Sequence, residues 1–92
     1  MLLHDCAMRK NTRGVKWLLK QFCNVNARND SGETALHFAV MRNDSPTISA
    51  LLEHGADRHI KDAKGNTPLL LAQSVNDYLF AFVRGEKLMY EE

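Results

Sequence analysis

The feature that most constrains the fold of this chain is an internal repeat of 33 residues. Residues 32–39 read GETALHFA and residues 65–72 read GNTPLLLA, so Gly, Thr, Leu and Ala return at the same spacing. The same shift aligns the first third of the chain with the second in the pairs Leu3 and Leu36, His4 and His37, Met8 and Met41, and Arg9 and Arg42. Such a period is typical of proteins in which each copy stacks on its neighbours.

Each copy predicts two short helices followed by an extended loop. Thr34 is a suitable N-cap, because its hydroxyl accepts from the free backbone N–H groups that begin a helix. Pro68 occupies the favoured first position of the corresponding helix in the next copy. Residues 43–46, NDSP, end the first helix, and we expect Ser45 to cap the second. Gly55 then ends the second helix in the left-handed conformation.

Apolar residues spaced by three and four positions predict the buried faces of the helices. In the central copy these residues are Leu36, Ala39 and Val40, followed by Ile48, Leu51 and Leu52. The last helix allows two registers. Strict spacing would bury Ala81 and Arg84, whereas a shortening by two residues would bury Leu79, Phe82 and Val83. We favour the shortening, because burial of an unpaired arginine is costly.

These segments resemble the ankyrin repeat, whose unit carries a Thr-Pro-Leu-His stretch and a Leu-Leu-x-x-Gly-Ala-Asp stretch. The central copy matches it at Gly32, Thr34, Leu36, His37, Ala39, Leu51, Leu52, Gly55, Ala56 and Asp57. The resemblance implies an all-α solenoid of stacked antiparallel helix pairs with β-hairpin-like finger loops. We expect a single domain over residues 1–92 with about three repeats, at 1–28, 29–61 and 62–92. The first repeat is atypical, with Phe22 and Cys23 where Gly and Ala are expected, and so is the last.

Composition argues against several functional classes. The net charge is +1 and no cluster of lysine and arginine forms the patch expected of a nucleic-acid binder. The longest apolar runs are too short to cross a bilayer. Two cysteines do not make a disulfide framework, so we expect a reducing compartment, the cytoplasm or also the nucleus.

The histidines and cysteines favour a structural interpretation over a catalytic one. His37 and His4 occupy the position at which the family's histidine bonds the capping turn, and Cys6 takes the small apolar position of Ala39. His54 lies at a helix end, and His59 lies in a polar loop. No phosphate loop, metal-ligand pair or nucleophile with its base is recognisable. We therefore expect a protein that is not an enzyme and needs no cofactor or metal.

Binding is expected on residues that the repeat itself does not require. The resemblance implies a protein partner bound by the finger loops and by the concave face of the inner helices. The residues predicted to bind it are Met8, Arg9, Asp30, Glu33, Phe38, Met41, Arg42, Lys64, Asn66 and Leu71. Phe38 has two interpretations: it faces outward in this surface, or it folds against the fingers.

The last helix suggests an alternative function in self-assembly, either as the edge of a longer array or as a homo-oligomer. Tyr78, Leu79, Phe80 and Phe82 make it apolar nearly all round. The tail could cover it through Leu88 and Met89, or another chain could. A modification is also conceivable, because residues 24–27, NVNA, resemble the loop asparagine that asparaginyl hydroxylases modify in ankyrin repeats. Asn26 would be the target, although an ordinary loop asparagine is the simpler interpretation.

Overall fold

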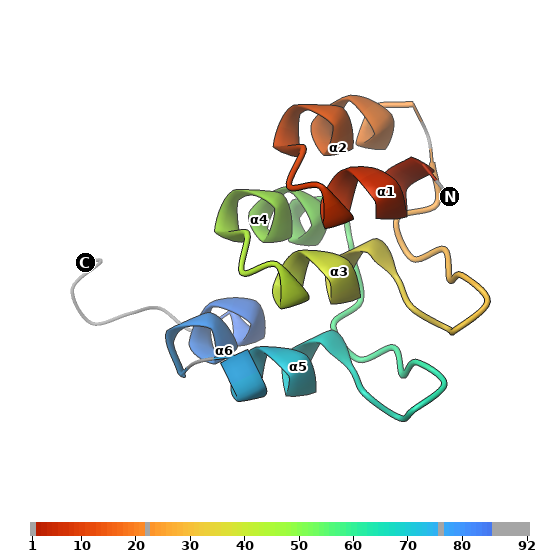
Figure 1. The fold of residues 1–92 in the computed structure, drawn as a ribbon. Helices are drawn as coiled ribbons and strands as arrows, with labels where there is room; N and C mark the ends of the chain where they lie inside the picture. The colour runs from red at the N-terminus through yellow and green to blue at the C-terminus, as the bar shows by residue number, and fades with distance from the viewer. Residues whose placement is uncertain (1, 22, 76, 86–92) are drawn as a thin grey trace.

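The computed structural model describes residues 2–21, 23–75 and 77–85, which form six helices and contain no β-strand. The helices are α1 (Leu2–Met8), α2 (Thr12–Leu19), α3 (Ala35–Met41), α4 (Ser45–Glu53), α5 (Pro68–Val75) and α6 (Asp77–Arg84). Helices α1, α3 and α5 stack in one layer, α2, α4 and α6 form a second layer behind it, and both long loops project on the same side (Figure 1). The predicted all-α stack of helix pairs is confirmed.

The first helix of the central pair begins at the predicted cap. The Thr34 hydroxyl accepts from the His37 backbone N–H, and the His37 side chain accepts in return from the Thr34 backbone N–H, at 3.0 Å. This reciprocal capping box satisfies N–H groups that a helix start otherwise leaves unpaired. In the third pair, the Thr67 hydroxyl accepts from the backbone N–H of Leu70, and α5 starts at Pro68 as predicted.

The start of α4 differs from the prediction. The N-cap is Asp44 and not Ser45, which is already the first helical residue. The Asp44 carboxylate does not cap the backbone; it accepts from the buried Thr47 hydroxyl at 2.6 Å. Thr47 in turn accepts from the Thr12 hydroxyl of α2 at 2.8 Å, so the residue before α4 is held by a contact to the preceding outer helix. Gly55, at φ +88°, ends α4 as predicted.

The core runs through all three pairs. Its fully buried large side chains include Val15 in α2, Leu36 and Val40 in α3, Ile48 and Leu51 in α4, and Leu79 and Val83 in α6. Small residues let the inner helices approach one another: Cys6, Ala7, Ala35, Ala39 and Ala72 are all buried. Leu52, predicted to be buried, is only partly so.

The last helix adopts the shortened register. Leu79 and Val83 are fully buried, Phe82 is partly buried, and Arg84 is exposed. The physical reason is the one expected, since the guanidinium stays in solvent and the apolar side chains take the positions inside. The predicted cover of this helix by Leu88 and Met89, and the departure at Phe22, lie outside the described residues.

Candidate functional site

The finger loops are shaped by one polar side chain at the start of each turn. In the first finger, the Asn29 side-chain oxygen accepts from the backbone N–H groups of Ser31 and Glu33, both at 2.9 Å. The backbone N–H of Asn29 also donates to the Glu33 carbonyl at 2.9 Å, which closes a hairpin-like turn. The tip is therefore held by hydrogen bonds on both sides of the turn.

The second finger repeats this arrangement with a carboxylate. Asp62 accepts from the backbone N–H groups of Lys64 and Asn66 at 2.9 Å and 2.8 Å. The Asn66 hydrogen bond, and to a smaller extent that of Lys64, lowers the pKa of the Asp62 carboxyl, although desolvation opposes the shift. The loop consequently keeps a negative charge at its turn under mildly acidic conditions.

Each finger is tied to the helix of the preceding repeat by a histidine. His4 Nε2 donates to the Glu33 carbonyl at 2.7 Å, and His37 Nε2 donates to the Asn66 carbonyl at 2.9 Å. His37 Nδ1 accepts from the Thr34 backbone N–H, so the proton of the ring lies on Nε2. Both histidines are buried. The predicted bond to the capping turn is confirmed for His37, whereas His4 contributes to the frame through its bond to the Glu33 carbonyl.

The two fingers and two inner helices enclose a groove of about 360 Å³. It is lined by Ser31, Glu33, Met41, Asp62, Ala63, Lys64, Asn66 and Leu71. Five of the residues predicted to bind a partner thus meet in one place: Glu33, Met41, Lys64, Asn66 and Leu71. Met41 and Leu71 form an apolar floor, and the finger residues form a polar rim.

The other predicted binding residues are not part of the groove lining. Met8 is 44% exposed on α1, as Met41 is 45% exposed on α3. Arg9 pairs with Asp5 at 3.1 Å, and Arg42 is exposed at the end of α3. Asp30 is also exposed, at the tip of the first finger.

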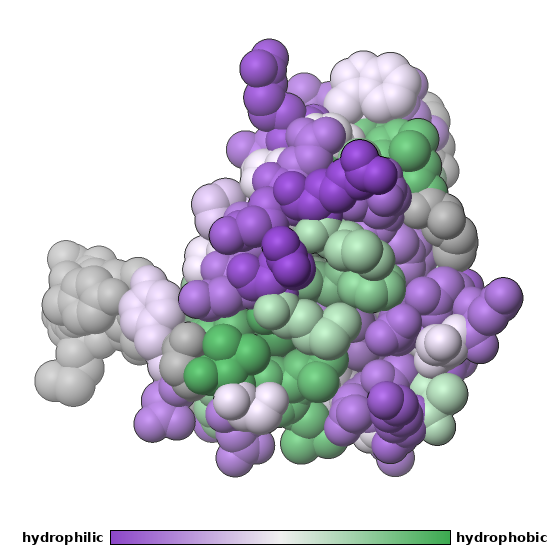
Figure 2. All heavy atoms as spheres, in the orientation of Figure 1, coloured by the Kyte–Doolittle hydropathy of each residue, from purple (hydrophilic) through white to green (hydrophobic). Residues whose placement is uncertain are grey.

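Phe38 takes an orientation between the two that were considered. It is partly buried, and its ring meets the edge of the His4 ring at a centroid distance of 5.7 Å and an interplanar angle of 76°. It therefore packs against the preceding repeat and leaves part of its surface on the inner-helix face. In Figure 2 an apolar area lies in the middle of this face, over α3 and α5, between polar regions.

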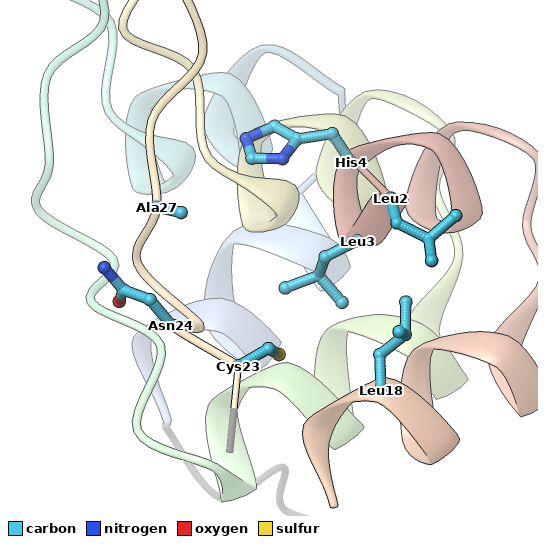
Figure 3. A pocket seen from close by; sticks show the side chains of 7 residues that line it. All are labelled: Leu2, Leu3, His4, Leu18, Cys23, Asn24 and Ala27. Carbon is cyan, nitrogen blue, oxygen red and sulfur yellow. The ribbon is translucent and has the colours of Figure 1, made fainter. Parts of the chain in front are cut away.

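A second hollow, of about 270 Å³, lies between α1, α2 and the loop that follows α2. Its lining is mainly apolar: Leu2, Leu3, His4, Leu18, Cys23, Asn24 and Ala27 (Figure 3). His4 is only 4% exposed there, and within residues 2–21, 23–75 and 77–85 its Nδ1 has no hydrogen-bond partner. The equivalent atom of His37 accepts from the Thr34 backbone N–H at 3.0 Å.

One member of the predicted self-association set is wrong. Leu79 is fully buried within the stack, because the shortened register turns it inward, and so it cannot contact another chain. Tyr78 is 51% exposed, and Phe80 and Phe82 are partly buried. Phe80 also carries the Arg84 guanidinium over its ring, at 5.2 Å from the centroid.

Two residues that link the loops were missed by the sequence analysis. The Asn26 side chain accepts from the Asp57 backbone N–H at 2.8 Å and donates to the Gly55 carbonyl at 3.4 Å. Arg28 donates to the Lys61 carbonyl at 2.8 Å. Asn26, considered as a modification target, therefore has its amide engaged with the next loop.

The described part of the chain contains neither a cluster of metal ligands nor a membrane-spanning helix. Within residues 2–21, 23–75 and 77–85, no three histidine, cysteine or acidic side chains come together as a metal site would require. No helix in these ranges is long and apolar enough to cross a membrane.

Comparison with known proteins agrees with the repeat. A family model described as ankyrin repeats, in three copies, matches residues 3–83. A putative ankyrin repeat protein of Acanthamoeba polyphaga mimivirus is 40% identical over 63 residues, which are 68% of this chain and 9% of that protein. The tyrosine-protein kinase HTK16 of Hydra vulgaris is 43% identical over 70 residues, 73% of this chain and 9% of the kinase.

The match covers a larger share of a mouse relative. The ankyrin repeat domain-containing protein 40 of Mus musculus is 39% identical over 70 residues, 75% of this chain and 19% of that protein. The chain thus spans less than a fifth of the length of each of these relatives.

Proposed function

Because the chain belongs to the ankyrin-repeat family, we propose that it is a non-catalytic module that binds a partner protein through its finger loops and the concave face of its inner helices. Ankyrin repeats generally mediate protein–protein interaction. The observation that carries the proposal for this chain is the groove in which Glu33, Met41, Lys64, Asn66 and Leu71 meet.

The groove has the composition of an interface rather than of a catalytic centre. Its apolar floor offers contact area, and its polar rim offers hydrogen bonds, which is the usual anatomy of a protein-binding surface. The hydrogen bonds at Asn29 and Asp62 hold the rim in shape before a partner arrives, so that little ordering entropy is lost on binding. Both cysteines are free, which fits a module of the cytoplasm or nucleus.

The test is capture of a partner by the immobilised chain from a cell lysate. The double variant Met41→Glu with Lys64→Glu places a negative charge on the apolar floor of the groove and reverses a charge on its rim. We expect the amount of captured partner to fall about tenfold, as the loss of a central contact worth about 1.4 kcal/mol would produce. The control is Lys16→Glu with Gln21→Glu on exposed positions of α2 and just beyond it, with the same change in net charge. Capture that is equal in both variants, at equal thermal stability, contradicts the proposal.

Self-association is a second candidate, because Tyr78 is 51% exposed and Leu70 is 49% exposed at the last repeat. Partly buried Phe80 and Phe82 extend this apolar surface. Sedimentation at several protein concentrations tests it, and a mass that stays monomeric throughout excludes it. Binding to nucleic acid would instead fall steeply with salt, which the same capture assay measures.

A further inference from the structure

We propose that the inner-helix face takes an amphipathic α-helix whose apolar stripe is flanked by acidic side chains. This inference rests on the proposed function of the same face and names the chemistry of its partner. The argument has three parts: the spacing of the apolar side chains, the absence of a strand edge in the described residues, and the position of the arginines.

Apolar side chains are present on this face in all three repeats. Met8 and Met41 occupy equivalent positions in α1 and α3, and Phe38 and Leu71 occupy equivalent positions in α3 and α5. Val75, 39% exposed, extends the row at the end of α5. Packed helices lie about 8–10 Å apart. Residues seven apart on an α-helix lie about 10.5 Å apart on one face, so a helix laid across the stack meets each repeat with one apolar side chain.

An extended partner finds less to bind. A strand gains affinity by main-chain hydrogen bonds to a sheet edge, and the described residues contain no β-strand. The fingers already use backbone groups on one another, as in the hydrogen bond of 2.9 Å from the Ala63 N–H to the Ser31 carbonyl. A helix, by contrast, satisfies its own backbone and needs only side-chain contacts.

The positive charges of Arg9 and Arg42, beside these apolar side chains, favour a partner helix with acidic residues on one flank. Arg9 and Arg42 follow the last residues of α1 and α3, at the end of the inner helices away from the fingers. In the described part of the chain the Arg42 guanidinium makes no hydrogen bond or ion pair. Arg9 meets only Asp5, in a pair whose side chains are 75% and 48% exposed. Exposed pairs of this kind stabilise little, so Arg9 can turn to a partner's carboxylate.

The finger side does not oppose this arrangement. Glu33 and Asp62 are acidic, and Lys64 lies beside them in the groove, so this side carries both signs of charge. The lowered pKa of Asp62 keeps its charge in place. A partner helix with acidic residues on one flank is therefore oriented with that flank toward the arginines.

The test uses three synthetic peptides of about three heptads each, with one apolar stripe. The first has glutamates along one flank, the second has lysines at the same positions, and the third is the acidic peptide with a central proline that breaks the helix. Binding to the chain is measured by fluorescence anisotropy. We expect the acidic peptide to bind about tenfold more tightly than the lysine peptide, because its glutamates pair with the two arginines. It should also bind about tenfold more tightly than the proline peptide, because only an unbroken helix presents a continuous apolar stripe.

A charge reversal on the chain separates this effect from general stickiness. Arg9→Glu with Arg42→Glu should reverse the preference in favour of the lysine peptide. Arg13→Glu with Lys16→Glu makes the same change in net charge at exposed positions of α2 and should leave the preference as it was. If the reversed variant unfolds, Arg9→Gln with Arg42→Gln replaces it and should remove the preference.

Three results overturn the inference: equal binding of the acidic and basic peptides, equal binding of the peptide with proline, or no binding of any peptide. These outcomes are distinct from failure of the proposed function. If lysate capture depends on Met41 and Lys64 while none of the peptides binds, the chain binds a protein at this face, and the helical acidic partner is refuted.

Discussion

Replacement of His37 by leucine tests how much of the stability of the stack depends on one buried ring. His37 is fully buried and bonds at both nitrogens: Nδ1 accepts from the Thr34 backbone N–H at 3.0 Å, and Nε2 donates to the Asn66 carbonyl at 2.9 Å. Leucine fills a similar volume and occurs naturally at the equivalent position 70. The His37→Leu variant therefore removes the polar contacts and largely preserves the packing.

The expected loss follows from the two groups left behind. The Thr34 N–H belongs to a residue only 1% exposed, and a buried donor without a partner costs about 1–3 kcal/mol. The hydrogen bond to the Asn66 carbonyl is only part-buried, so losing it costs about 0.5–1.5 kcal/mol. The free energy of unfolding should fall by about 2–4 kcal/mol, a large part of the 5–15 kcal/mol typical of a domain.

Equilibrium unfolding in urea measures this loss, with the slope against urea concentration expected to stay constant. His4→Leu is the matched control, because in the described part of the chain His4 bonds only through Nε2, to the Glu33 carbonyl, and its Nδ1 has no partner. It should cost about 0.5–1.5 kcal/mol. Equal losses in the two variants, or a loss below about 1 kcal/mol for His37→Leu, would refute the reasoning.

Three further predictions concern other contacts. Gly32→Ala should lower the free energy of unfolding by at least about 1 kcal/mol more than Gly65→Ala. Both glycines have positive φ, but a Cβ at Gly32 would lie 3.1 Å from the backbone nitrogen of Ala63 in the next finger, whereas a Cβ at Gly65 would meet nothing within 4 Å. Thermal unfolding measures this, and equal losses contradict it. Asp62→Asn should destabilise the fold at pH 7 and make no difference at low pH. Folding lowers the pKa of the Asp62 carboxyl, so its ionised form stabilises the fold above the ordinary pKa of about 3.9. This contribution disappears as the pH falls through the lowered pKa. Urea unfolding at both pH values checks it, and a difference independent of pH argues against it. Thr47→Val should cost about 2–3 kcal/mol in the same assay, because it leaves the buried Asp44 carboxylate without its donor at 2.6 Å; a loss within error would show that water replaces the hydroxyl.

The features that the sequence predicted correctly are those that local chemistry decides. Thr34 caps α3 because a hydroxyl before an apolar run has a nearby backbone N–H to accept from. Gly55 ends α4 because the left-handed conformation favours glycine. The register of α6 followed from the cost of burying Arg84, a single physical comparison that needs no knowledge of the neighbouring helices.

The features that it missed depend on contacts between repeats. Asp44 replaces Ser45 as the N-cap of α4; its carboxylate accepts from the Thr47 hydroxyl within α4, and Thr47 in turn accepts from the Thr12 hydroxyl of the neighbouring helix α2. Arg28 bonds the carbonyl of Lys61, which lies 33 positions later. A pattern of residue types records which side chains are polar, but it does not identify a partner that only the stacked loops bring close.

The sequence predicted several residues of the candidate groove, but not the groove itself. The repeat assigns Glu33, Met41 and Leu71 to the fingers and the inner helices, which meet in any such stack. The orientation of Phe38 was left open, because it depends on the ring of His4 in the preceding repeat. Burial of Leu79 removed it from the predicted self-association surface for the same kind of reason.

The histidine bonds have a mechanical consequence. His4 and His37 each reach 29 positions forward, to the carbonyls of Glu33 and Asn66. A force applied to a finger therefore passes through its histidine bond into the helix of the preceding repeat, so that two neighbouring repeats share the load. Because both bonds run from a histidine to a carbonyl later in the chain, each finger is anchored to the repeat on its N-terminal side.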